Sequence, residues 1–168
     1  MIKLYLRGNI MFRPLRRIKQ QLPKEECISI LKQEVRGVLS VLGDNDYPYG
    51  LPINFWYSEK ENKIYFHGAR EGHKIDSIKK HNKVSFCVYD KGIQVEGKNG
   101  LDYKSVIVFG KIKQVEDRNK TNDICRKLSA QFDFSQDYIE EEINKFAKFV
   151  LCLELTPEHI SGKKVNES

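Results

Sequence analysis

Six short apolar segments separated by turn signals limit, more than any other feature, what this chain can fold into. Most are joined by short connections rich in Gly, Asn, Asp or Pro, such as residues 43–48. Strands at this spacing favour an antiparallel barrel over a parallel sheet, because parallel neighbours need longer crossovers. The expected strands cover residues 38–42, 49–57, 64–67, 84–89, 105–115 and 149–155.

Helices are expected at the periphery of this barrel. Pro23 suits a first helical turn, and Ser135 is a suitable N-cap. The predicted helices cover about residues 23–35, 72–81, 118–132 and 136–147. Pro157 is expected to end the last strand, and the polar tail from Gly162 is expected to fray. The predicted fold class is mainly β with peripheral helices, a six-stranded antiparallel β-barrel.

The 168 residues fit a single domain with a buried core. We expect residues 1–12 to be an N-terminal extension, with either Met1 or Met11 as the natural start. Residues 13–164 are expected to form the domain, and residues 165–168 a frayed tail.

The net charge of +6 raises the question of a nucleic-acid partner. The basic residues are spread along the chain, and no aromatic residue lies between Arg13, Arg16 and Arg17. A base-stacking surface is therefore not indicated. A solvated basic face or an attraction for anionic ligands is the expected meaning.

The compartment follows from two patterns. No segment approaches the roughly 18 consecutive apolar residues of a membrane-spanning helix, and the charged start does not match a secretory signal. We therefore expect a cytoplasmic protein that does not enter a membrane. The cysteines, including Cys87 and Cys152 in apolar strands, have no metal-binding or CxxC spacing, so no metal site and no structural disulfide is expected. Those two are expected to be small buried side chains.

Residues 63–78 carry the most informative local pattern. They contain a strand over residues 64–66, a loop with Gly68 and Gly72, and a helix start with Lys74. Backbone N–H groups at a helix start are unpaired, and the helix dipole favours an anion there. Lys74 would add a mobile positive charge. Read alone, the pattern is typical of a plain connector, and an anion site is the alternative that it leaves open.

His67 is the candidate catalytic residue. Ile64 and Phe66 share one face of the strand, so Tyr65 and His67 share the other. An imidazole there could donate to a bound ligand or a substrate, or relay a proton. The alternative is a histidine satisfied by a backbone carbonyl at the strand end.

Two residues of the second strand constrain its surroundings. Pro52 cannot donate a ladder hydrogen bond, so the strand is expected to be an edge or to be bulged there. Trp56 is the only tryptophan and is expected to anchor the core or a dimer interface.

Four blocks of sequence carry a resemblance to a known family. They are Gly50-Leu-Pro-Ile-Asn-Phe55, Ile64-Tyr-Phe-His-Gly-Ala69 followed by Gly72-His-Lys-Ile-Asp76, Ser105-Val-Ile-Val-Phe-Gly-Lys111, and Ile160-Ser-Gly-Lys163. In this order and spacing they resemble the FMN-binding split-barrel superfamily, which includes pyridoxamine 5′-phosphate oxidase. Within it, the chain is most similar to the nitroimidazole-resistance-type flavoproteins.

What the resemblance implies is a homodimer with FMN at the subunit interface. The implied cofactor-binding residues are Leu51, Pro52, Ile53 and Asn54 along the flavin ring, His67 and Gly68 beside the ring and ribityl chain, His73 and Lys74 at the phosphate, and Ser105 and Val106 on the fifth strand, near or across the interface. Histidine at position 73 stands where some branches have arginine.

The implied function is that of an FMN-dependent oxidoreductase acting on a small molecule such as a nitroaromatic. No dinucleotide fingerprint is present, so NAD(P)H would bind only transiently at the flavin. The alternative is a non-catalytic flavin- or haem-binding protein of the same fold, with His67 or His73 as the axial ligand. Pyridoxamine 5′-phosphate oxidase activity itself is not expected, because the C-terminal third has no tryptophan and no arginine after Arg126.

Overall fold

Six antiparallel strands form one barrel in this chain, for which a computed structural model describes residues 12–97 and 99–166. The strands follow the order β4-β1-β2-β3-β7-β6, and β6 pairs with β4 to complete the ring. They are β1 (Arg36–Leu42), β2 (Pro48–Ser58), β3 (Lys63–Ala69), β4 (Lys83–Tyr89), β6 (Leu101–Gln114) and β7 (Val150–Val165). The predicted fold class is thereby confirmed.

Alternating side chains fill the barrel. In β6, burial alternates residue by residue from Val106 to Ile112, which places every second side chain in the interior. At the centre, the ring of Phe86 meets the rings of Phe55 and Phe66 edge-on, with centroids 4.9 and 5.0 Å apart. Each fully buried aromatic ring of this kind contributes about 1.5–3 kcal/mol to folding.

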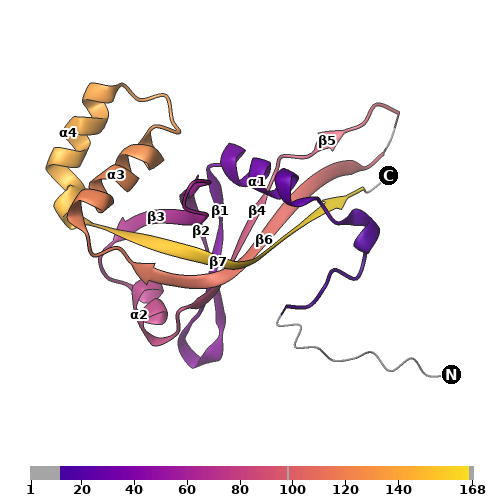
Figure 1. Cartoon of the computed structure of the whole chain (residues 1–168), viewed down its shortest axis with the longest axis horizontal. Coiled ribbons are helices and arrows are strands. Elements are labelled where there is room, and N and C mark those ends of the chain that lie inside the picture. The colour runs from indigo at the N-terminus through magenta and orange to yellow at the C-terminus, as the bar shows by residue number, and fades with distance from the viewer. Residues whose placement is uncertain (1–11, 98, 167–168) are drawn as a thin grey trace.

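Helices lie around the barrel (Figure 1). They are α1 (Lys24–Gln33), α2 (His73–Lys80), α3 (Arg118–Ser129) and α4 (Gln136–Phe146). α1 places Cys27, Ile30 and Leu31 in the main core. α3 and α4 are inserted between β6 and β7 and lie together at one end of the molecule (Figure 1). As predicted, Ser135 caps α4, and its hydroxyl accepts a hydrogen bond from the N–H of Tyr138.

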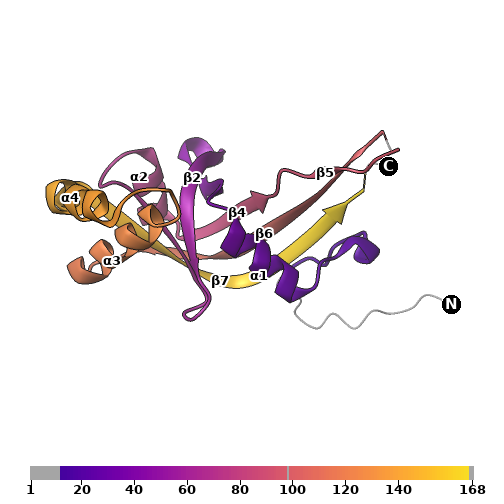
Figure 2. The same ribbon diagram turned by 90° about the horizontal axis from the view of Figure 1, so that it is seen from above.

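Short elements complete the structure. β5 and the first part of β6 extend away from the barrel as an arm (Figure 2). The remaining elements are β5 (Ile93–Gln94) and the 3-10 turns η1 (Ile18–Gln20), η2 (Asp44–Asp46) and η3 (Ala147–Phe149). Among the described residues, no helix has the length and apolarity that a membrane crossing requires.

The prediction that Pro157 ends the last strand is wrong. β7 continues to Val165, which pairs with Tyr103. Phe109 pairs with His159 and the next residue, Gly110, pairs with Pro157, so Glu158 forms a bulge in β7 directly after the proline, where its missing N–H is tolerated. The expected fraying therefore fails for residues 162–165.

The predicted ends of the chain are only partly described. The proposed extension, residues 1–12, falls outside the described residues except for Phe12, whose ring stacks on His159 at 4.8 Å. Of the tail, residues 167–168 also lie outside the described part of the chain.

Candidate functional site: an open seam between two strands

The barrel is open along part of one strand pair. β2 and β3 pair only from Phe55 opposite Phe66 to Ser58 opposite Lys63. Beyond that point the β2 residues pair only with β1, and residues 67–69 pair only with β7. We call the facing, unpaired edges of residues 52–54 and 67–69 the open seam. It exposes backbone hydrogen-bonding groups that any ligand can use.

The direction of these groups follows from one hydrogen bond. The N–H of Phe55 donates to the carbonyl of Val35 at 3.0 Å, on the β1 side. Successive residues of a strand point their N–H and C=O groups to opposite sides. The N–H and C=O groups of Asn54 therefore face the seam, and so does the C=O group of Pro52, two residues earlier. Pro52 therefore loses no ladder bond, and the predicted free edge at this residue is confirmed.

Lys74 reaches the seam from the start of α2. A Cβ atom on Gly68 would lie only 2.6 Å from the Lys74 Nζ, so the ammonium occupies the space that glycine leaves free. Burial lowers the pKa of Lys74 below its usual 10.5. Within residues 12–97 and 99–166, no acidic group pairs with this ammonium. A partly desolvated cation without a counter-charge is suited to hold an anion.

The backbone beside Lys74 adds donors. The first hydrogen bond of the helix is donated by Ile75 to the carbonyl of Gly72 at 2.8 Å. The N–H groups of His73 and Lys74 precede it and have no partner within the helix. The sequence-based expectation of free amides together with a lysine at this helix start agrees with this geometry.

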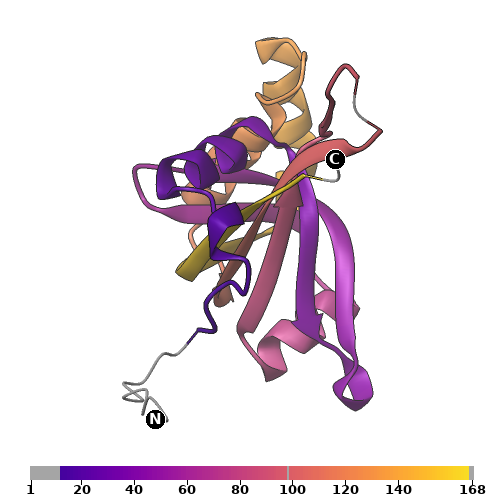
Figure 3. The same ribbon diagram turned by 90° about the vertical axis from the view of Figure 1, so that its right-hand side faces the viewer.

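His73 points elsewhere. Its ring stacks on Tyr49, with centroids 4.3 Å apart, and its Nε2 accepts a hydrogen bond from the N–H of Asp44 at 3.4 Å. The tip of the β1–β2 hairpin, which carries Asp44, reaches beside α2 (Figure 3). The two basic residues predicted to act as a pair therefore contact different neighbours, Lys74 at Gly68 and His73 at the hairpin tip.

His67 lies at the β3 edge of the seam. It shares the strand face of Tyr65, as predicted, and lines a cavity of about 160 Å³ against α3 and α4. Crowding by neighbouring atoms, and then the charge of Lys74, lowers the pKa of His67 below 6.5 although part of the ring stays exposed. The imidazole is therefore neutral at pH 7.

The remaining predicted residues divide into two groups. Leu51 and Ile53 are half-buried against the barrel core, next to the seam. Val106 is completely buried within the single chain, and its contact with a cofactor stays a prediction. Ser105 lies on β6, three strand spacings or about 14 Å along the sheet from β2. Ser105 therefore does not reach the seam of its own chain.

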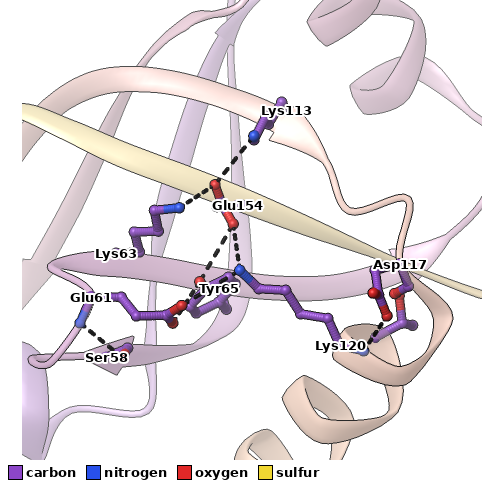
Figure 4. Close-up of polar contacts among 9 residues, drawn as sticks. Ser58, Glu61, Lys63, Tyr65, Lys113, Asp117, Lys120 and Glu154 are labelled. Atoms are coloured by element: carbon purple, nitrogen blue, oxygen red, sulfur yellow. Dashed lines mark hydrogen bonds and ion pairs between the residues drawn. The ribbon is translucent and has the colours of Figure 1, made fainter.

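A second polar cluster escaped the sequence reasoning (Figure 4). Glu154 of β7 is only 3% exposed, yet it accepts hydrogen bonds from Lys63 at 2.6 Å and Lys120 at 2.9 Å, with Lys113 at 3.6 Å. Tyr65 donates to Glu61 at 2.7 Å beside it. We call these residues the Glu154 cluster.

The charged groups of the Glu154 cluster are paired with one another. Burial alone would raise the pKa of Glu154, but the hydrogen bonds from Lys63 and Lys120 outweigh it and lower the pKa to about 2. The cluster borders a hollow of about 690 Å³, but its charges already satisfy one another. The signal that could have revealed it is a glutamate inside the apolar run Leu151–Leu155.

The closed antiparallel ring with one open seam defines a split-barrel protein. Residues 23–164 match the family described as pyridoxamine 5′-phosphate oxidase, and the chain belongs to this family. No curated protein matches the chain. The family predicted from the four sequence blocks is therefore confirmed.

Solved structures share the fold. One is a candidate 5-nitroimidazole antibiotic resistance protein from Bacteroides thetaiotaomicron, with 19% identity, a TM-score of 0.71 and 86% of each chain covered. The FAD-binding protein from Mycobacterium smegmatis is 20% identical, with a TM-score of 0.63, over 88% of this chain and 99% of that one. An FAD- and haem-binding protein from the same organism is 16% identical, with a TM-score of 0.64, over 89% and 74%.

Proposed function

We propose that this chain is a flavoprotein that holds FMN in the open seam and uses it to reduce a small molecule such as a nitroaromatic. The observation that carries the proposal is the half-buried Lys74 ammonium, which has no counter-charge among the described residues and lies at the end of two unpaired strand edges. Similarity to proteins that bind FAD supports a flavin as the ligand.

The phosphate end of the seam suits FMN. Lys74 and the free N–H groups at the start of α2 offer one compact set of donors for one terminal phosphate. This is why we propose the mononucleotide and not FAD. His73 already accepts a hydrogen bond from Asp44, so it contributes its backbone N–H and not its ring.

The ring end of the seam offers both donors and acceptors. The N–H of Asn54 and the C=O of Pro52 face the seam, where the polar rim of a flavin can meet them. The Asn54 side-chain oxygen accepts from Arg36 at 2.8 Å, which leaves its NH₂ group to donate. Leu51 and Ile53 supply apolar surface nearby.

Bound FMN would supply the hydride and electron transfer, with NAD(P)H as a transient donor. His67 is neutral at pH 7, so one ring nitrogen carries a proton that it can donate to a substrate and the other can accept one. We propose His67 as the catalytic residue in this sense.

We also propose a homodimer with the cofactor at its interface. The outer face of β2, β1, β4 and β6 carries two cross-strand rows of smaller residues, which end at Ile107 and Phe109; these two side chains are 38% and 39% exposed. These smaller residues are Pro52, Val38 and Cys87 in one row and Gly50, Ser40 and Ser85 in the other. Ser105 belongs to the same face, so a second copy would bring its own Ser105 toward this seam.

Sedimentation of an Ile107→Asp variant tests the dimer. We expect a dimer for the unmodified chain and a monomer for the variant, with Phe149→Asp as an exposed control on the opposite side of β3. A wild-type chain that sediments as a monomer while retaining flavin overturns the dimer proposal.

A non-catalytic flavin- or haem-binding protein is the second candidate. The observation in its favour is the neutral, partly exposed imidazole of His67, which is suited to an axial position. The visible spectrum of the purified protein separates the candidates, since flavin gives a double band and haem a Soret band.

The decisive experiment identifies the cofactor. The purified protein is denatured and the released molecule is identified by mass, for the wild type, Lys74→Ala, and Lys79→Ala as an exposed control on the same helix. We expect FMN from the wild type and Lys79→Ala and a loss of retention of about tenfold or more in Lys74→Ala. Unchanged retention in Lys74→Ala would show that the phosphate assignment is wrong, and a released FAD or haem would overturn FMN.

A further inference from the structure

Two cysteines from distant parts of the chain meet beneath the helical layer. The Sγ atoms of Cys125 on α3 and Cys152 on β7 are 3.9 Å apart. Cys152 is fully buried, and its single S–H proton lies within reach of both the Cys125 sulfur and the carbonyl of Thr121, 3.7 Å away. The two sulfurs must approach to about 2 Å to form a disulfide, which small side-chain rotations and a slight shift of α3 can provide.

Cys125 is reachable from solvent. It is only partly buried and lines the 160 Å³ cavity together with His67. A hydroperoxide is small enough to enter a cavity of this size. Cys152 has no such access, so the two sulfurs differ in the roles they can take.

The charges around Cys125 favour its thiolate. Its hydrogen bond with Cys152 is the main cause that lowers the pKa of Cys125, and Arg118 and Arg126 add positive charge. Glu142 of α4 and the neutral His67 of β3 also face the cavity. Arg126 also donates a hydrogen bond from its Nε to the carboxylate of Glu140 at 2.7 Å. Burial raises the pKa of Cys87, which makes it a useful comparison on the other side of the barrel.

We propose that Cys125 and Cys152 form a reversible disulfide when the protein meets a hydroperoxide, with Cys125 as the attacking thiol and Cys152 as the resolving one. This site does not depend on the proposed flavin. In a reducing compartment such a bond would be transient and regulatory, not structural.

The peroxide is the only oxidant that this reaction needs. The Cys125 thiolate attacks one peroxide oxygen, the O–O bond breaks, and the departing oxide takes up a proton to leave as water or an alcohol. The sulfur of Cys152 then attacks the Cys125 sulfenic acid. The S–S bond forms, the S–O bond breaks, and the hydroxide leaves as water with the Cys152 proton. The two thiols lose two electrons and the peroxide gains them.

The position of the bond links it to the candidate site. Cys152 is the cross-strand partner of His67, and both side chains lie on the face that α3 covers. A disulfide would tie α3 to the strand position opposite His67. It would also change the wall of the cavity that His67 lines.

Mass mapping of the cysteines tests the proposal. Reduced protein is treated with a small excess of hydrogen peroxide, the remaining thiols are capped with N-ethylmaleimide, and the protein is digested without reductant. We expect linked peptides that contain Cys125 and Cys152, reversed by dithiothreitol, while Cys27 and Cys87 are capped. Without peroxide, Cys125 should be capped at pH 7 about tenfold faster than Cys87.

Variants assign the two roles. Cys125→Ser abolishes the linked peptide, and Cys87→Ser leaves it unchanged. In Cys152→Ala the Cys125 sulfenic acid should persist and be trapped by dimedone. Because Cys152 is buried, Cys125→Ser carries the test if Cys152→Ala fails to fold. Full capping of Cys125 after peroxide, or a link to Cys87 or to a second chain, would overturn the proposal.

Discussion

Two regions close to β3 contain partly buried lysines, and their charges are organised in opposite ways. In the Glu154 cluster, Lys63, Lys113 and Lys120 converge on one buried carboxylate. At the seam, the half-buried ammonium of Lys74 stands over Gly68 without an acidic partner among the described residues. The pKa shifts run in opposite directions, since Lys120 is raised mainly by its hydrogen bond with Tyr65 and Lys74 is lowered by burial.

The difference separates a structural charge from a binding charge. A buried group that is fully paired stabilises the fold and has little left to offer a ligand. A desolvated cation without a partner costs stability in the free protein, and that cost is recovered only when an anion binds. The four predictions below test this distinction.

The largest effect is expected from Glu154→Gln. Removing the carboxylate leaves three lysines around an uncharged amide, so the free energy of unfolding should fall by about 3–5 kcal/mol. Urea denaturation measures it. Glu158→Gln on the same strand is the control, because its pair with Lys111 is exposed and should contribute less than about 1 kcal/mol. Equal losses in both variants would contradict a special role for Glu154.

Acid should remove the same stabilisation. The pKa of Glu154 is lowered from 4.5 to about 2, so its contribution is fully present above pH 4.5 and is lost as the pH falls toward 2. A shift of this size corresponds to about 3 kcal/mol. Denaturation curves from pH 6 to pH 2 should show this loss in the wild type and a shallower one in Glu154→Gln. Parallel curves would refute it.

Gly68→Ala should weaken flavin retention with little loss of stability. The new Cβ would displace the Lys74 ammonium, whose side chain is flexible enough to move. We expect the affinity for FMN to fall about tenfold, or about 1.4 kcal/mol. Lys79→Ala is the control, because this side chain is exposed and lies on the same helix as Lys74. A loss of retention in the control alone would contradict the prediction.

The smallest effect is expected from Lys74→Met on the free protein. Its unfolding free energy should stay the same or rise by up to about 1 kcal/mol, whereas Lys120→Met should lower it by about 1–3 kcal/mol. Because the pKa of Lys74 is lowered, the unfolded chain binds more protons just below pH 10.5. The unfolding free energy of the wild type should therefore rise as the pH increases through that window. The Lys74→Met variant should not show this rise.

The fold could be predicted largely because its signals are local. Burial alternates along β1, β4 and β6, short turns join several of the strands, and four blocks of sequence identified the family. The prediction at Pro157 failed because proline usually ends a strand, whereas here a bulge at the next residue, Glu158, lets β7 continue. No local rule reveals a bulge that depends on the register of a partner strand.

The site was less predictable because side-chain directions decide it. His73 and Lys74 are adjacent in sequence, but one residue of helix rotates the side chain by about 100°, and the ring of Tyr49 captures His73. The residues of the Glu154 cluster come from four separate parts of the sequence and meet only in the folded chain. The contacts of Leu51–Asn54, His67 and Gly68 with a flavin remain predictions for the experiments above.

The insertion of α3 and α4 between β6 and β7 has a consequence for the speed of folding. These two strands form the longest ladder of the barrel, yet residues 115–149 separate them along the chain. Closing a hairpin around so long a segment costs about 2 kcal/mol more chain entropy than a four-residue loop would. The β6–β7 ladder should therefore form late in folding, after the compact β1–β2 hairpin. Substitutions in β7 should change the folding rate more than substitutions in β1 do.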